Sequence, residues 1–277
     1  MANSWLKYVI LQMAYLLLLI SLPANAIIVR HDTGYGRFIA SESDYPAIFP
    51  LLRSEHGHTC VASLIAERWA LTAAHCVLET GLSEAMDSHQ SYPVAIAGTA
   101  NEIVKVIFHP RWPGIARDTQ SAGEVDLALL KLSHATPGVS PLVIYNGRSE
   151  AGRQLTFLGW GSAGMGSSED RFRDGRLRFA RNSVVAANSH LHFDFDDPAP
   201  RGSLAVPFEG IPGLGDSGGP ALLPDDDVQV LFGVAVGELG GPERQGRYGA
   251  RIIYERVSLH ADWIVEHADG VQVSALQ

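Results

Sequence analysis

About a dozen short apolar segments, separated by turn residues, limit what this chain can fold into. Most are rich in Val, Ile, Leu, Phe or Ala and are bounded by Gly, Pro, Asp or Ser, the pattern that predicts a β-strand. Segment 126–132 also fits a short helix, but the flanking Gly123 and Pro137 favour the strand. The predicted strands are 47–53, 60–66, 69–72, 93–98, 102–109, 126–132, 155–161, 176–187, 190–196, 221–223, 228–236 and 252–257.

One helix is predicted, at 259–268, with Trp263 and Ile264 on its inward face. We also expect a tight helical turn at 73–76 and irregular chain at 81–92 and 161–175. The sequence has no internal repeat and no coiled-coil pattern. Many short strands with one terminal helix predict an all-β barrel or sandwich.

Residues 1–26 have the composition of a secretory signal peptide. Lys7 is their only charge, 9–22 is apolar, and Ala24-Asn25-Ala26 fits a cleavage site. The alternative, an uncleaved membrane anchor, is disfavoured because the apolar stretch is shorter than the roughly 20 residues that a membrane span needs. We therefore expect a mature chain, 27–277, that is secreted or periplasmic and not held in a membrane after cleavage.

Acidic residues outnumber basic ones in this chain. The sequence has 21 Lys+Arg and 30 Asp+Glu, a formal net charge of −9, and removal of Lys7 makes the mature charge about −10. An acidic balance without a basic run argues against nucleic acid and anionic membrane surfaces as partners. The only two cysteines are Cys60 and Cys76. In an oxidising compartment an even count favours a disulfide over a metal site, and we expect no metal and no cofactor.

The stretch Gly213-Leu214-Gly215-Asp216-Ser217-Gly218-Gly219-Pro220 carries the strongest chemical signal. It places a serine among glycines, which are needed where the backbone takes unusual dihedral angles or a ligand approaches the main chain. A serine presented in this way, among free N–H groups, suits a nucleophile beside an oxyanion-binding pocket. A glycine-rich surface turn is the alternative interpretation of this stretch alone.

Two further segments accompany the serine, in the chain order His, Asp, Ser, which is one of the known orders for a Ser-His-Asp triad. They are Thr72-Ala73-Ala74-His75-Cys76 and Asp126-Leu127-Ala128-Leu129-Leu130. With these three blocks the chain resembles the chymotrypsin-like (trypsin-type) serine proteases. Leu158-Gly159-Trp160-Gly161, Tyr254-Glu255-Arg256-Val257 and Trp263-Ile264 also sit where that family has similar pieces, so the resemblance spans most of 27–267.

The resemblance implies two six-stranded antiparallel β-barrels with a short C-terminal helix, divided into lobes at approximately 27–140 and 141–277. It implies that Ser217 attacks the scissile carbonyl, His75 transfers the proton, and Asp126 orients and stabilises the imidazole. The N–H groups of Gly215 and Ser217 would form the oxyanion hole. Cys60 and Cys76 match the family disulfide that holds the histidine loop.

The resemblance also implies a buried ion pair at the new N-terminus. Members of the family become active when a cut exposes an Ile or Val whose amine pairs with the aspartate before the nucleophile. No propeptide separates the predicted signal from the domain here. We therefore expect signal cleavage itself to expose Ile27, whose ammonium would pair with Asp216.

The specificity pocket departs from the commonest family pattern. Ile211 stands where the family has the pocket base, and an apolar floor disfavours Lys or Arg side chains, whose charge would be buried unpaired. Val236-Gly237-Glu238 corresponds to the family's Ser-Trp-Gly, and Ile252 replaces a wall glycine. We expect a preference for small or apolar residues at P1, the substrate residue before the cut, although Glu238 could recruit a basic side chain.

The sequence therefore predicts an exported, monomeric serine endopeptidase that acts on proteins or peptides. The absence of second-barrel disulfides points to a bacterial source. One alternative is a protease-like domain that binds protein without cutting it, which the altered pocket would allow. Another reads Gly215–Gly219 as the nucleophile elbow of an α/β-hydrolase esterase, which is disfavoured because Pro220 and a hairpin follow the serine and His75 precedes it.

Overall fold

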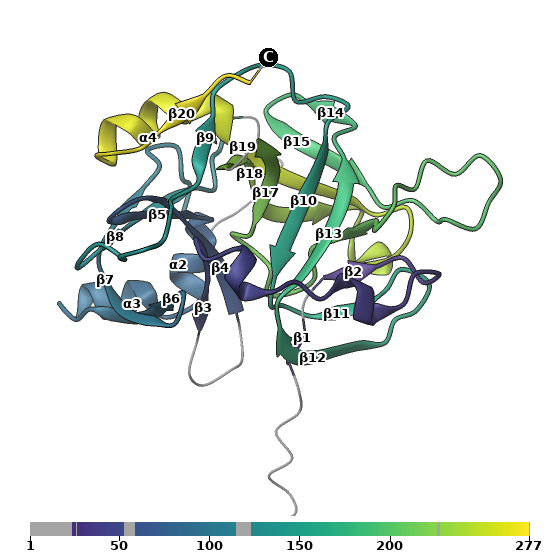
Figure 1. Cartoon of the computed structure of the whole chain (residues 1–277), viewed down its shortest axis with the longest axis horizontal. Helices are drawn as coiled ribbons and strands as arrows, with labels where there is room; N and C mark the ends of the chain where they lie inside the picture. The colour runs from purple at the N-terminus through teal and green to yellow at the C-terminus, as the bar shows by residue number, and fades with distance from the viewer. Residues whose placement is uncertain (1–23, 26, 53–58, 115–122, 226–227, 277) are drawn as a thin grey trace, which may run out of the picture.

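The structure, a computed structural model, describes residues 24–25, 27–52, 59–114, 123–225 and 228–276 (Figure 1). The predicted signal peptide therefore lies almost wholly outside the described residues. Within these ranges the chain forms three β-sheets and three short α-helices. None of the helices described is long and apolar enough to cross a membrane. The predicted all-β class is confirmed.

The first sheet contains the six strands that follow the N-terminal segment, drawn in blue in Figure 1. All its pairs are antiparallel, in the order β3-β4-β5-β8-β7-β6. The two outer strands, β3 and β6, contact each other, so the sheet curls into a barrel. Its strands are β3 (Ile48–Leu52), β4 (Thr59–Ala66), β5 (Trp69–Thr72), β6 (Tyr92–Ile96), β7 (Thr99–Phe108) and β8 (Ala128–Leu132).

The second sheet, mostly green in Figure 1, has nine strands among the described residues, three more than the resemblance implies. Its main path is β13-β10-β17-β18-β19-β15-β14, and β9 joins β18 and β20 in parallel. Its strands are β9 (Val143–Tyr145), β10 (Gln154–Gly159), β13 (Arg178–Ser183), β14 (Ala186–Ala187), β15 (His190–Asp194), β17 (Pro220–Asp225), β18 (Val228–Leu239), β19 (Arg251–Arg256) and β20 (Val273–Ser274).

A third, small sheet joins the segment around Ile27 to the segment that follows β10. Its order is β1-β12-β11-β2-β16, so chain regions more than a hundred residues apart pair directly. Its strands are β1 (Ala24–Asn25), β2 (Ile28–Val29), β11 (Ala163–Met165), β12 (Arg171–Arg176) and β16 (Gly210–Ile211).

Each barrel-like sheet encloses its own apolar core. One cluster is centred on the first sheet, with Leu64, Leu71 and Leu129 fully buried. The other lies within the second sheet, where the rings of Phe157 and Tyr254 stack at 4.8 Å. The chain passes from the first sheet to the second between β8 and β9.

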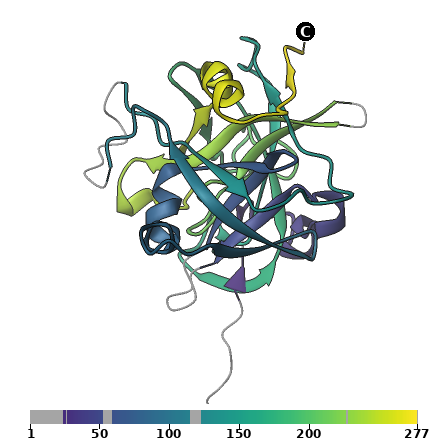
Figure 2. The same ribbon diagram turned by 90° about the vertical axis from the view of Figure 1, so that its left-hand side faces the viewer.

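The C-terminal helix α4 (Ala261–His267) closes one end of the first barrel, as Figure 2 shows from the side of the first sheet. Trp263 and Ile264 of α4 belong to the first core cluster, which confirms their predicted inward orientation. The indole Nε1 of Trp69 donates a 2.6 Å hydrogen bond to Asp269, just beyond the helix. The other helices are α2 (Ala74–Glu79) and α3 (Leu82–Asp87).

Two segments predicted as irregular contain regular structure. Helix α3 forms within 81–92, where a six-residue helix with one fully buried side chain, Leu82, is too short to show a periodic pattern. Strand β11 and most of β12 form within 161–175, because Ile28 and Val29 pair with β11 from far away in the sequence. Local composition does not report such distant pairing.

Candidate active site

His75 and Asp126 are joined by two hydrogen bonds. His75 lies at the start of α2, directly after β5, and Asp126 lies just before β8, the strand that pairs with β5. The backbone N–H of His75 donates to Asp126 Oδ1 at 2.8 Å, and its Nδ1 lies 2.6 Å from Asp126 Oδ2. Both side chains are about 5% exposed. The aspartate therefore fixes the plane of the imidazole and leaves Nε2 facing away from it.

Ser217 lies on the loop between β16 and β17, and this loop packs against the first barrel. The N–H of Val61 in β4 donates a 2.8 Å hydrogen bond to the carbonyl of Ser217. A Cβ at Gly218 would collide with Thr72 and with the Val61 carbonyl, and Gly218 has a φ of 77°. Glycine is therefore required for the serine loop to approach the end of β5, next to His75.

The three residues expected to form the triad thus come together where the two barrels meet. Within the described residues no hydrogen bond links His75 to Ser217. Such contacts are often long in unliganded enzymes and tighten when substrate binds. Ser217 is followed by β17, a strand, and not by the helix of an α/β-hydrolase elbow, so the esterase interpretation is wrong.

The N–H groups of Gly215 and Ser217 donate to no acceptor among the described residues, whereas their neighbours do. Asp216 N–H donates to Gly213, and Gly218 N–H donates to Ala235. Gly215 has a φ of 97°, a conformation that favours glycine. This turn leaves the N–H groups of Gly215 and Ser217 available to donate to a negatively charged oxygen.

The Asp216 side chain points away from Ser217 into the protein, where it is 1% exposed. Its carboxylate accepts hydrogen bonds from three backbone N–H groups, those of Gly161 at 2.6 Å, Gly213 at 2.8 Å and Ile27 at 3.0 Å. Burial raises the pKa of Asp216 to about 6 even though these bonds lower it. The structure therefore brings Ile27 and Asp216 together, with Ala26 still attached to Ile27.

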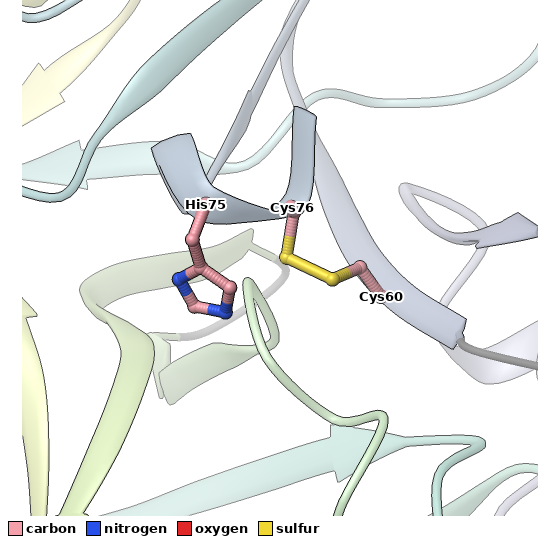
Figure 3. A group of neighbouring side chains, drawn as sticks. All are labelled: Cys60, His75 and Cys76. Carbon is pink, nitrogen blue, oxygen red and sulfur yellow. A yellow bond between two sulfur atoms is a disulfide. The ribbon is translucent and has the colours of Figure 1, made fainter. Parts of the chain in front are cut away.

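Cys60 and Cys76 form a disulfide, which joins β4 to α2. Figure 3 shows that His75 and Cys76 project from the same short helix, one toward the second barrel and the other toward Cys60. Donor atoms of these three residues lie within 4.8 Å of one another. Because both sulfurs are in the disulfide, neither can act as a thiolate ligand for a metal. The disulfide instead ties the histidine helix to the barrel.

A cavity of about 320 Å³ opens beside Ser217. Val236, Glu238 and Ile252, all predicted for the specificity pocket, line it. Ile211 is fully buried in β16 and is not among the residues that line the cavity. Apolar side chains make up much of the wall, and the lining residues besides these three include Ile28, Arg171, Pro212, Leu214, Ala235 and Gln245.

Two of the charged side chains that line the cavity, Glu238 and Arg171, are both bonded to Gly246, and a third, Glu169, forms an ion pair with Arg247. The N–H of Gly246 donates to both carboxylate oxygens of Glu238, at 2.9 and 3.2 Å. The carbonyl of Gly246 accepts a 2.8 Å hydrogen bond from Nη2 of Arg171. Burial raises the pKa of Glu238, and the Gly246 N–H and the Arg171 charge oppose that rise. The Arg171 guanidinium therefore partly offsets the Glu238 charge.

Two residues of this region were not predicted from the sequence. Arg171 belongs to the segment predicted as irregular, and nothing in its local sequence indicates that β12 lies beside the pocket. Glu255 belongs to the family-like block 254–257, and its Oε1 accepts a 2.7 Å hydrogen bond from the N–H of Asp126. Its place in the predicted strand 252–257, next to apolar residues, was the available signal, because a buried carboxylate needs partners.

Comparison with known proteins agrees with this architecture. A model of the Trypsin family matches residues 36–264. Serine protease SP24D of Anopheles gambiae is 29% identical over 243 residues, which cover 83% of this chain and 79% of that protein. A trypsin of Phaedon cochleariae is 28% identical over 260 residues, which cover 89% of this chain and 90% of that protein. A solved structure entitled "HL collagenase" superposes with a TM-score of 0.57 at 21% identity, over 83% of this chain and 96% of that one, and shows the shared fold.

The predicted bacterial source gains no support from these relatives, which come from insects, and another similar trypsin comes from the mite Tyrophagus putrescentiae. The family match covers both barrels and all three expected triad residues. This chain therefore belongs to the trypsin family and is a serine-type endopeptidase.

Proposed function

We propose that this protein is an exported endopeptidase that cuts peptide bonds through His75, Asp126 and Ser217. The observation that carries the proposal is the pair of hydrogen bonds between His75 and Asp126, made at the interface on which Ser217 also lies. This arrangement leaves Nε2 of His75 available to accept the hydroxyl proton of Ser217 when a substrate binds.

In the proposed reaction Ser217 Oγ attacks the carbonyl carbon of the scissile bond while His75 Nε2 takes the hydroxyl proton. The oxygen that becomes negative accepts hydrogen bonds from the N–H groups of Gly215 and Ser217. The imidazolium, stabilised by Asp126, then gives its proton to the leaving amine, and an acyl-enzyme forms. Water hydrolyses this ester by the same steps, with His75 again as base and then as acid, and Ser217 is restored.

We also propose that residues 1–26 direct export and that their removal completes the enzyme by exposing the Ile27 amine. Asp216 is buried and its hydrogen-bond donors are neutral backbone N–H groups, so a positive charge at Ile27 would compensate the carboxylate. Ile27 also has a φ of 63° while Ala26 is attached, which is unfavourable for a β-branched residue. Cleavage after Ala26 would remove that restriction and supply the ammonium.

For the pocket we propose a preference for small or apolar side chains at P1. Glu238 by itself would attract Lys or Arg, but Arg171 lies beside it and opposes its charge. With these two charges offset and Glu169 paired with Arg247, much of the remaining wall is apolar and includes Val236, Leu214 and Ile252. Burial of a substrate's apolar side chain against these groups contributes roughly 25 cal/mol per Å². The proposed substrates are protein or peptide chains. We propose that the enzyme acts as a monomer.

Labelling with a fluorophosphonate, which reacts only with activated serines, tests the proposal. Protein beginning at Ile27 is compared with its Ser217→Ala and His75→Ala variants, and circular dichroism verifies that each is folded. Labelling that disappears in both variants supports the triad. A folded, unmodified protein that is neither labelled nor able to cleave casein would contradict it and favour a protein-binding role.

A further inference from the structure

A buried carboxylate, that of Glu255, lies directly behind Asp126 and has no part in the mechanism described above. Glu255 belongs to β19 and is 2% exposed. Its Oε1 accepts a 2.7 Å hydrogen bond from the backbone N–H of Asp126. Asp126 uses Oδ1 and Oδ2 for His75, so the side chain faces the histidine while the backbone is held from the other side.

The bond from the Asp126 N–H to Glu255 is one of the few hydrogen bonds described that hold the backbone around Asp126 in place. The segment that carries Asp126 is attached to the first barrel by the N–H of Val125, which donates to Arg111, and by the carbonyl of Asp126, which accepts from Ala74 at 3.3 Å. Glu255 provides its attachment to the second barrel. The Glu255 side chain thus connects Asp126 of the first barrel to the second sheet. That sheet also contains β17, the strand that follows Ser217.

Two histidines flank Glu255 on opposite sides. His190, its cross-strand partner in β15, has Nε2 3.6 Å from Oε1, and His260, just before α4, has Nε2 3.7 Å from Oε2. Burial by itself would raise the pKa of Glu255, but the two imidazoles and the Asp126 N–H lower it to about 2. The carboxylate is therefore negatively charged at neutral pH.

The other titratable groups around Glu255 are few among the described residues. Glu124 lines the same small cavity as Asp126, His190 and Glu255. The ring of His109 packs at 4.9 Å from that of His260, and burial together with the His260 charge lowers the pKa of His109 to about 4. His109 is accordingly neutral at ordinary pH and adds no charge there.

We propose that Glu255 is a positioning residue for Asp126 and a second buried negative charge that stabilises the imidazolium form of His75. The inference rests on the proposed triad. Its bond to the Asp126 N–H sets where the aspartate stands, and its charge acts on the proton that His75 gains during attack. His190 and His260 hold the carboxylate in place.

The test is the pH profile of kcat/KM for the protein beginning at Ile27 and its Glu255→Gln variant. Glutamine keeps an oxygen that can accept the Asp126 N–H but removes the charge. A unit charge several ångström away acts on a titration by about one pH unit at an effective dielectric near 20. We expect the acid limb of the kcat/KM profile to move to lower pH in Glu255→Gln, by about half a unit or more.

Glu255→Asp keeps the charge and shortens the reach, so its acid limb should stay near that of the unmodified protein while kcat falls. The matched control is Glu150→Gln, because Glu150 is also a fully buried glutamate, bonded to Arg256 and Ser258 and to none of the triad residues. It should lower thermal stability without moving the acid limb. If Glu255→Gln does not fold, Glu255→Thr, which is smaller and also neutral, takes its place.

An acid limb that stays within about 0.2 pH units of the unmodified protein in a folded neutral variant, or that moves equally in Glu150→Gln, would overturn the inference. Failure of the triad itself looks different, because the unmodified protein would then show neither labelling by fluorophosphonate nor a measurable profile.

Discussion

Retaining a single residue, Ala26, provides a sharp test of the Ile27–Asp216 pair. Two proteins are compared, one beginning at Ile27 and one at Ala26. In the second, Ile27 contributes a peptide N–H at 3.0 Å from Asp216 but no charge. In the first, the same nitrogen is an ammonium. Everything else in the sequence is identical.

The structure supplies the magnitude. With an uncharged N–H at Ile27, burial raises the pKa of Asp216 from 3.8 to about 6. A shift of about two pKa units corresponds to about 3 kcal/mol lost when the carboxylate is ionised. The left-handed φ of 63° at Ile27 adds about 1–3 kcal/mol of strain. The protein beginning at Ile27 should therefore be more stable at pH 7 by about 3 kcal/mol or more.

The pH dependence has a definite sign. A carboxyl group whose folded-state pKa is raised contributes stability below its unfolded value, and this contribution is lost as pH rises through the folded value. The protein with Ala26 should therefore weaken between about pH 4 and pH 6, relative to the protein without it. The difference should be nearly constant from there to about pH 8, the ordinary pKa of an α-amino group. Because the carboxylate raises the pKa of the ammonium in the folded protein, the difference should shrink only above that pH.

Urea unfolding at several pH values measures this difference, and fluorophosphonate labelling measures the accompanying activity. We expect labelling of the Ala26 protein to be slower by at least about tenfold, because the loop that carries Ser217 is bonded through Asp216. A stability difference below about 0.5 kcal/mol, or one that does not change between pH 4 and pH 7, would refute the assignment of the ion pair.

Three further perturbations test other parts of the site. Arg171→Gln should leave the Glu238 charge unopposed, so kcat/KM for peptides with Lys or Arg at P1 should rise about tenfold relative to Leu, a ratio that a panel of fluorogenic peptides measures; an unchanged ratio would mean that Arg171 does not act on the pocket. Replacing Cys60 and Cys76 together by Ala removes a bridge across 16 residues and should lower the free energy of unfolding by about 3 kcal/mol, which chemical denaturation would detect; an equally stable variant would argue against a structural role. Gly218→Ala should reduce both stability, by about 2 kcal/mol or more, and the labelling rate, because a Cβ there collides with the first barrel; an unaffected labelling rate would show that the serine loop tolerates displacement.

Much of the candidate site could be predicted from the sequence because its signals are local. Each of the three blocks that hold His75, Asp126 and Ser217 has a recognisable composition, and the glycines around Ser217 are required by backbone geometry at that point. Strands such as β5 and β8 could also be predicted, because short apolar runs between turn residues indicate buried strands.

The specificity pocket and the support behind Asp126 were decided by the tertiary structure. Arg171 reaches the pocket because β12 lies in a sheet that includes Ile28, and Glu255 reaches Asp126 because β19 passes behind the first barrel's edge. These neighbours are separated by more than a hundred residues in the chain. A local sequence pattern indicates which side chains of a segment are buried. It does not indicate which charged residue from a distant segment will contact them, because that depends on how the two barrels pack together.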